Sequence, residues 1–287
     1  RMTCPARVQF STVSLSRYMA FAAVILCALP QSAGGQARKT VDVFFIGNSY
    51  IYYNNLPAQL EAMSESLTGG PVLRTAHHLH GGFTLRRHLE DGHLPDALAQ
   101  PTQDRSPWDV VVLQEQSRIG APYANQELGT IGDTEPFFEA AAEVVDLILG
   151  LGARPVFYMT WAKEAFPGQT DPIADAYDSA GDAHGADVAA AGIAWTRVRE
   201  ERPDIQLFHP DGSHPSPAGT YLVASVMYST LTGRSPLGAP RELHGRQMKS
   251  PGAFVSDDIV PLVRLPHETA RYLQSVAWET VEGRRRP

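Results

Sequence analysis

A serine and a histidine far apart in the sequence have the types and neighbours needed for nucleophilic chemistry. Ser49 ends the tripeptide G-N-S (47–49), directly after the apolar run 41–46, and His214 follows Asp211 by three residues in the segment D-G-S-H-P. A serine hydroxyl attacks well when a base takes its proton, and the base needs a third group to hold its tautomer. The turn between Asp211 and His214 contains a glycine, so the carboxylate can fold back onto the ring. We predict a catalytic triad of Ser49, His214 and Asp211.

Two other segments offer donors for the oxyanion of an acyl-transfer reaction. Gly81 and Gly82 follow the second expected strand, 72–77, and a glycine lets its N–H approach a ligand closely. The same pair also suits a tight strand-to-helix turn, and both interpretations can hold together. Gln114 and Gln116 follow the run 108–113, and a glutamine amide can donate to an oxyanion, although polar residues at a strand end are ordinary.

Together these four segments resemble the SGNH (GDSL-like) hydrolases, a superfamily that includes carbohydrate acetylesterases. Their nucleophile lies in a G-D-S block after the first strand, which the segment 47–49 matches with Asn48 in place of Asp. Gly82 matches the glycine whose N–H enters the oxyanion hole, and Asp211 and His214 match the last block. The resemblance spans about 170 residues. It implies a three-layer α/β/α sandwich with a central parallel sheet (SGNH/flavodoxin-like) and hydrolysis of carboxylic esters.

The third block departs from the family pattern, which is usually G-x-N-D. Without gaps, Gln116 replaces the Asn that donates to the oxyanion, and Ser117 replaces the Asp. Some carbohydrate acetylesterases instead carry a Q-G-E block, and on that alignment Gln114 is the donor. Both glutamines have the same strand parity, so we expect both to face the cleft. The resemblance implies an oxyanion hole built from the N–H groups of Ser49 and Gly82 and one of these amides.

The pattern of apolar runs predicts the elements that must position these residues. Strands are expected at 41–46, 72–77, 108–113 and 154–160, with a fifth ending at 192–195, and helices at 56–67, 83–89, 135–149, 173–191, 216–231 and 267–281. Such alternation is typical of a parallel sheet with helices on both faces, whose chemistry gathers at the carboxyl ends of the strands. Residues 234–264, rich in proline and glycine, are expected to form a long surface excursion. Asn48 and Trp161 are weaker candidates for substrate contact.

The first 37 residues have the features of a signal peptide. An uncharged apolar run at 18–29 follows three arginines and precedes small residues, with a cleavage site expected near Ala37. We predict residues 1–37 as signal peptide and 38–287 as the catalytic domain, secreted or periplasmic, with no stable membrane anchor after cleavage. An uncleaved anchor, a buried helix and a lipid on Cys27 are the alternatives. Cys4 and Cys27 both lie in the removed part, so the mature chain has no disulfide or thiol.

Composition and net charge limit the kinds of molecule that the protein is expected to bind. Hydrophobic residues make up 43% and charged residues 19%, as in a globular protein. The net charge of −7, or −10 with 21 basic and 31 acidic side chains after removal of residues 1–37, argues against nucleic acid. No cofactor is expected. His77, His78 and His80 suggest a metal, but strand alternation sends neighbouring side chains to opposite faces, so we predict no metal site.

The sequence thus predicts a secreted serine esterase that works through an acyl-enzyme. By resemblance, its substrate is an ester, with acetyl or other short acyl groups on a polysaccharide or glycoside. One alternative is a non-catalytic carbohydrate-binding protein on the same fold. The other is a metal-dependent hydrolase that uses His77, His78 and His80.

Overall fold

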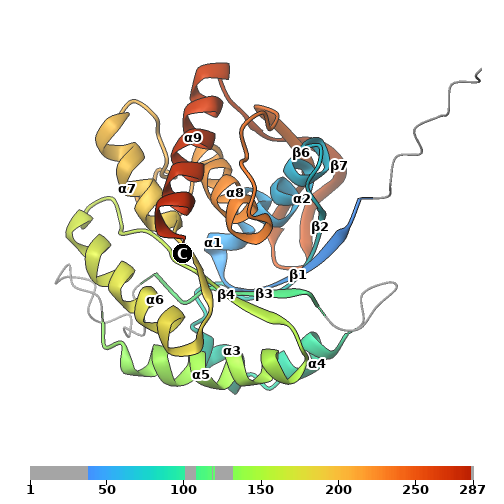
Figure 1. Ribbon diagram of the computed structural model, residues 1–287, viewed down its shortest axis with the longest axis vertical. Coiled ribbons are helices and arrows are strands. Elements are labelled where there is room, and N and C mark those ends of the chain that lie inside the picture. Colours follow the sequence, from blue (N-terminus) through green and yellow to red (C-terminus); the bar gives the residue numbers. More distant parts are fainter. Residues whose placement is uncertain (1–37, 101–107, 118, 120–131, 286–287) are drawn as a thin grey trace, which may run out of the picture. The chain divides into compact units, whose positions relative to one another are not determined.

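A parallel five-stranded sheet forms the centre of the computed structural model, which describes residues 38–100, 108–117, 119 and 132–285 (Figure 1). Its strand order is β2-β1-β3-β4-β5. The strands are β1 (Thr40–Gly47), β2 (Val72–Leu79), β3 (Val110–Leu113), β4 (Arg154–Tyr158) and β5 (Asp187–Ala189). This is the flavodoxin-like order, in which the order of strands along the sheet reverses between β1 and β3. In such folds, ligands bind at that point, outside the carboxyl ends of the strands.

Helices cover both faces of the sheet because its strands are apolar on both sides. In β1, Val43 and Phe45 pack into one buried cluster, while Phe44 and Ile46 pack into the other. The first cluster is completed by α1 (Ser49–Tyr52), α2 (Leu56–Ser66), α7 (Ala191–Glu201), α8 (Pro217–Thr232) and α9 (His267–Arg284). The second contains α3 (Leu85–Glu90), α4 (Leu94–Ala99), α5 (Glu135–Gly150) and α6 (Thr170–His184). The predicted three-layer α/β/α sandwich is confirmed (Figure 1).

The helix that follows the D-G-S-H-P segment begins and ends where the sequence predicts. Ser216 caps α8, since its side chain accepts a hydrogen bond from the N–H of Gly219 at 3.1 Å. Gly233 ends the helix in the left-handed conformation, with φ of 69°. The N-cap therefore fixes the chain two residues after His214.

The alanine-rich stretch after α6 differs from its prediction. The expected helix 173–191 ends at His184, where Gly185 adopts the left-handed conformation with φ of 60°. The fifth strand is only three residues long, at 187–189, and residues 192–195 lie inside α7 rather than at a strand end. Alanine suits helix and buried strand alike, so the sequence shows no period that would separate the three elements.

The expected surface excursion contains a β-hairpin. Strands β6 (Glu242–Ser250) and β7 (Ala253–Arg264) pair antiparallel beside α2 (Figure 1). Leu243 and Val263 anchor this hairpin in the core. Its register shifts at three places, so polar and apolar residues do not alternate regularly, which hid the strands in the sequence.

The N-terminal prediction lies outside the described residues. Residues 1–37 carry the expected signal peptide and its cleavage site near Ala37, so both stay predictions. Within the described ranges, no helix has the length and apolar character needed to cross a membrane.

Candidate active site

Ser49 lies at the carboxyl end of β1 as the first residue of α1. Asn48 caps this helix, accepting a hydrogen bond from the N–H of Tyr50 at 3.2 Å. The Asn48 amide also donates to the carbonyl of Phe83 at 2.9 Å, which ties the turn to the segment after β2. Asn48 is 2% exposed, so its side chain serves the turn more than a substrate.

The turn before Ser49 packs tightly against Gln114. The side-chain oxygen of Gln114 accepts the N–H of Asn48 at 2.8 Å, and its amide donates to the carbonyl of Glu115. A Cβ on Gly47 would lie 2.5 Å from that Gln114 oxygen, so only glycine fits there. Gln114 is fully buried and committed to holding the nucleophile turn.

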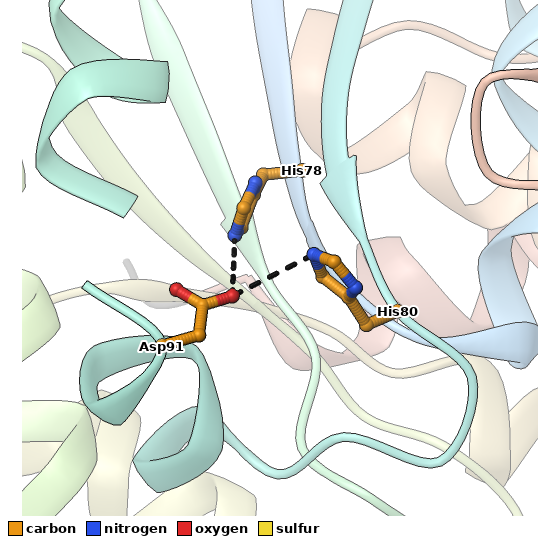
Figure 2. Close-up of side chains that lie close together, drawn as sticks. All are labelled: His78, His80 and Asp91. Carbon is orange, nitrogen blue, oxygen red and sulfur yellow. Dashed lines mark ion pairs between the residues drawn. The ribbon is translucent and has the colours of Figure 1, made fainter. Parts of the chain in front are cut away.

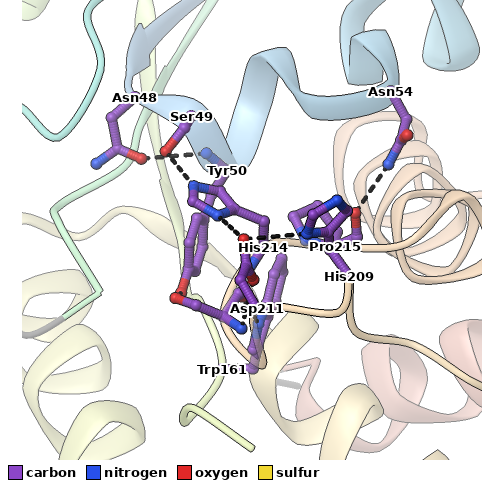
Figure 3. Close-up of polar contacts among 10 residues, drawn as sticks. Asn48, Ser49, Tyr50, Asn54, Trp161, His209, Asp211, His214 and Pro215 are labelled. Carbon is purple, nitrogen blue, oxygen red and sulfur yellow. Dashed lines mark hydrogen bonds and ion pairs between the residues drawn. The ribbon is translucent and has the colours of Figure 1, made fainter.

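A continuous chain of hydrogen bonds joins the three residues predicted as a triad (Figure 3). His214 Nε2 lies 2.8 Å from Ser49 Oγ, and His214 Nδ1 lies 2.7 Å from Asp211 Oδ2. Asp211 Oδ1 accepts the N–H groups of Ser213 and His214, both at 2.9 Å. The carboxylate therefore orients the ring so that its other nitrogen meets the serine.

The same contacts set the charge of Asp211. Partial burial acts to raise the pKa of this carboxyl, but the hydrogen bonds from the His214 ring and from two backbone N–H groups outweigh it and lower the pKa to about 2. Asp211 is therefore ionised at neutral pH.

The loop that carries Asp211 and His214 is fixed from several sides. The indole N–H of Trp161 donates to the carbonyl of Ser213 at 3.0 Å, and the N–H of His209 donates to the carbonyl of His214 at 2.8 Å. On the other side, the amide of Asn54 donates to the carbonyl of Pro215 at 2.9 Å (Figure 3). These contacts within the chain therefore hold the His214 loop in place.

Trp161 supports this loop instead of lining a groove. It is 1% exposed and stacks between Tyr50 and Trp195, with ring centroids 4.8 Å and 3.8 Å away. Trp195 is equally buried and belongs to α7, so it does not end a fifth strand as the sequence analysis expected. A stack of three aromatic rings thus runs from the core to the loop that carries Asp211 and His214.

Three tyrosines around Ser49 and His214 escaped the sequence analysis. The ring of Tyr53 stacks on the His214 imidazole, and the edge of Tyr50 faces it at 5.5 Å. Burial raises the pKa of the Tyr52 hydroxyl, and its proximity to the Ser49 side chain partly offsets this rise. The signal was available, because the segment S-Y-I-Y-Y (49–53) places three aromatic rings in the turn after the first strand.

A second histidine shares the triad carboxylate. His209 Nδ1 lies 3.1 Å from Asp211 Oδ2, the oxygen that also contacts His214 (Figure 3). Of these two rings, only His214 contacts Ser49 among the contacts of the described residues. The two rings therefore offer a matched pair for testing which one acts as base.

A cavity of about 310 Å³ opens over Ser49 and His214. Gly82, with φ of 70°, and Gln116 line this cavity, whereas Gln114 does not. The expectation that both glutamines face the cleft does not hold. Strand β3 ends at Leu113, so the alternation of side chains along a strand does not extend to the two glutamines. The remaining lining residues are Asn48, Tyr50, Tyr52, Tyr53, Gly81, Ser117, Lys163 and Ser213.

A buried carboxyl group lies directly behind Gln116. Glu115 accepts the N–H of Leu85 at 2.9 Å and the N–H of Gln116 at 2.5 Å. Burial raises the pKa of Glu115 to about 7, against the lowering effect of these two hydrogen bonds. The hydroxyl of Tyr177 accepts the N–H of Glu115 at 3.1 Å. Glu115 thus fastens the Gln116 backbone to the start of α3, a role that its sequence position did not reveal.

The histidine cluster does not assemble as a set of three. His77 lines a cavity with Glu61 and Thr75, on the opposite face of β2 from His78, as strand alternation predicts. His78 and His80 converge on Asp91 instead (Figure 2). None of these histidines is among the described residues that line the Ser49 cavity.

Comparison with known proteins finds similarity among solved structures. A candidate SGNH hydrolase from Slackia heliotrinireducens is 27% identical over 67% of this chain and 100% of its own, with a TM-score of 0.50. A DUF4886 family protein from Bacteroides uniformis is 17% identical over 85% of this chain and 95% of its own, with a TM-score of 0.61. No protein-family model and no curated protein matches the chain.

A catalytic mutant of an acetylxylan esterase from Geobacillus stearothermophilus shares the fold at 14% identity. It covers 71% of this chain and 99% of its own, with a TM-score of 0.52. The chain therefore resembles the SGNH hydrolases. This confirms the resemblance to that superfamily inferred from the four sequence segments.

Proposed function

We propose that the protein is a secreted serine esterase that hydrolyses short acyl esters, acetyl above all, on carbohydrates. One observation carries this proposal: Ser49 Oγ, His214 and the Asp211 carboxylate form a chain with links of 2.8 and 2.7 Å at the mouth of a cavity. A serine, a base and an orienting carboxylate in this order are the parts that acyl transfer requires.

The reaction begins when Ser49 Oγ attacks the ester carbonyl carbon while His214 Nε2 takes the serine proton. The N–H groups of Ser49 and Gly82 and the amide of Gln116 stabilise the resulting oxyanion. The histidine then gives its proton to the departing alcohol, which leaves an acyl-enzyme on Ser49. Water, deprotonated by the same nitrogen, attacks this acyl-enzyme, and collapse of the second tetrahedral intermediate releases the carboxylic acid and restores the serine hydroxyl.

The substrate class is inferred from two observations. The similar structures include acetylxylan esterases. The cavity of about 310 Å³ is small, and its tyrosine, lysine and serine side chains suit a short acyl group attached to a polar alcohol. Secretion is proposed from the apolar segment at 18–29 and its flanking residues.

A panel of esters tests the proposal. Purified protein is assayed with p-nitrophenyl esters from acetate to decanoate, beside acetylated xylan and pectin. We expect highest kcat/KM with acetate, and release of acetic acid from acetylated polysaccharide. A fluorophosphonate probe should label Ser49, and Ser49→Ala should abolish both labelling and turnover. Full labelling of Ser49→Ala would overturn the nucleophile, and no turnover of any ester would favour the carbohydrate-binding alternative.

A further inference from the structure

Two histidines and an aspartate outside the Ser49 cavity point their ligand atoms at a common centre (Figure 2). His78 lies on β2, His80 directly follows that strand, and Asp91 caps the end of α3. One nitrogen from each ring and one carboxylate oxygen all lie within 4.8 Å of one another. We propose that this trio is a binding site for a divalent transition-metal ion of the zinc type.

The distances between these atoms match ligands of one ion. His78 Nε2 and His80 Nε2 lie 3.4 and 3.6 Å from Asp91 Oδ2. A tetrahedral zinc ion with bonds of about 2.0–2.1 Å separates its ligand atoms by roughly 3.3 Å. The observed separations are longer than a good hydrogen bond and close to this ligand spacing.

Unused hydrogen-bonding capacity supports the same conclusion. Within the described residues, His78 Nε2 and Asp91 Oδ2 are buried atoms that make no hydrogen bond. The other carboxylate oxygen, Asp91 Oδ1, accepts the N–H of His93 at 2.9 Å, which holds the side chain in its orientation. The contact between these two atoms is the ion pair at 3.4 Å, which is longer than a good hydrogen bond and leaves capacity for a metal ion between them.

The ligand types of the trio also suit a metal ion. Two imidazoles and one carboxylate favour zinc-like ions over calcium or magnesium, which prefer oxygen. His80 is 42% exposed, so solvent can bring the ion in and complete its coordination with water.

The proposed metal site connects two elements that lie on either side of the segment containing Gly82. A bound ion would join β2 to the end of α3, and between them runs the segment 81–84 that contains Gly82. His88 on the same helix donates from Nε2 to the carbonyl of Gly47 at 2.9 Å. Metal binding is therefore expected to stabilise the scaffold of the active site. The proposal does not depend on esterase activity, because binding is measured without substrate.

The test measures zinc in purified protein. After equilibration with zinc chloride at about pH 7.5 and dialysis, we expect about one zinc per chain and a melting temperature raised by roughly 5 °C. Replacing zinc by cobalt should give visible ligand-field absorption, and calcium and magnesium should neither be retained nor raise the melting temperature.

Variants locate the ion. His78→Gln and Asp91→Asn should weaken zinc binding at least tenfold, whereas His77→Gln, one residue away on the opposite face, should bind like wild type. His80→Gln is the second variant, because its partly exposed side chain is least needed for folding. Zinc retained equally by all variants, or not retained by folded wild type, would overturn the proposal.

Discussion

The ring of Tyr53 lies flat on the imidazole of His214, with centroids 4.0 Å apart and planes inclined by 10°. Stacking fixes the ring plane, while the Asp211 carboxylate fixes its rotation within that plane. The proposed base is thus held by two independent contacts, from residues that lie far apart in the sequence.

Removing this ring should loosen the base without removing it. We expect Tyr53→Ala to lower kcat by about fivefold, in line with the roughly 1 kcal/mol of an aromatic stack. Tyr53→Phe should keep near-normal kcat, since the ring rather than the hydroxyl makes the contact. Steady-state kinetics and the rate of fluorophosphonate labelling measure both. Equal damage in the two variants would transfer the role to the hydroxyl.

His214 and His209 provide a direct comparison of two rings on one carboxylate. His214→Ala should lower kcat by about 10³-fold or more, because triad members act as a unit. His209→Ala should stay within a few-fold of wild type, since this ring touches Asp211 but makes no described contact with Ser49. A His214→Ala variant that keeps half its rate, measured on p-nitrophenyl acetate, would rule out this base.

Replacing Gln116 should lower activity, whereas replacing Gln114 should lower stability. Gln116→Ala removes a side chain that lines the cavity, so kcat should fall by about 10²–10³ with KM little changed. Gln114→Ala leaves the N–H of Asn48 without its buried acceptor, so its main effect should be a lower melting temperature. Kinetics and thermal unfolding on both variants separate the roles. Near-normal kcat in Gln116→Ala would leave the oxyanion to backbone N–H groups alone.

Glu115 should make stability depend on pH. Its folded pKa of about 7 lies above the usual carboxyl value of about 4.3, so the folded state holds this proton more tightly. The stabilisation is complete below about pH 4 and is lost as pH rises through 7, on the order of 3 kcal/mol.

Urea unfolding from pH 5 to pH 8 measures this slope. We expect the free-energy difference between wild type and Glu115→Gln to shrink or reverse at the alkaline end. Glu200→Gln, on the exposed face of α7, is the matched control and should run parallel to wild type. A Glu115→Gln curve that also runs parallel to wild type would contradict the assignment.

The proposed mature N-terminus has its own test. Arg38 donates from its guanidinium to the carbonyls of Ser64, Leu67 and Gly70 at 2.6 to 2.8 Å. A chain that starts at Arg38 should fold, stay active and melt at a temperature unaffected by dithiothreitol, because it contains no cysteine. Arg38→Ala in that chain should lower the melting temperature by roughly 5 °C. An inactive chain from Arg38 would make residues 1–37 structural.

Local patterns allowed much of the fold and site to be predicted from sequence. Three elements can be identified from a few neighbouring residues. Strand β1 is an apolar run, helix α8 begins at a serine cap and ends at a glycine, and the D-x-x-H segment places a carboxylate three residues before an imidazole ring. These features depend on neighbours in the chain, so one sequence suffices to find them.

Features that depend on distant partners were missed. No residue near Gln114 in the sequence indicates that its side-chain oxygen accepts the N–H of Asn48, 66 residues away. Asp91 lies 13 and 11 residues from the histidines that it joins, on another element. The bulged hairpin also lacks a regular period, so its burial becomes visible only once α2 and α8 are in place.

The sequence separation within the proposed triad has a consequence for how the enzyme acquires activity. Asp211 and His214 are three residues apart, so they can meet early in folding, whereas Ser49 lies 165 residues from its base. Closing so long a loop is slow and requires the elements on both sides to be assembled. A partly synthesised or half-folded chain therefore carries an unactivated serine. The rate at which a fluorophosphonate labels Ser49 during refolding would therefore report when the whole domain has folded. Before that point, we expect Ser49 not to be labelled.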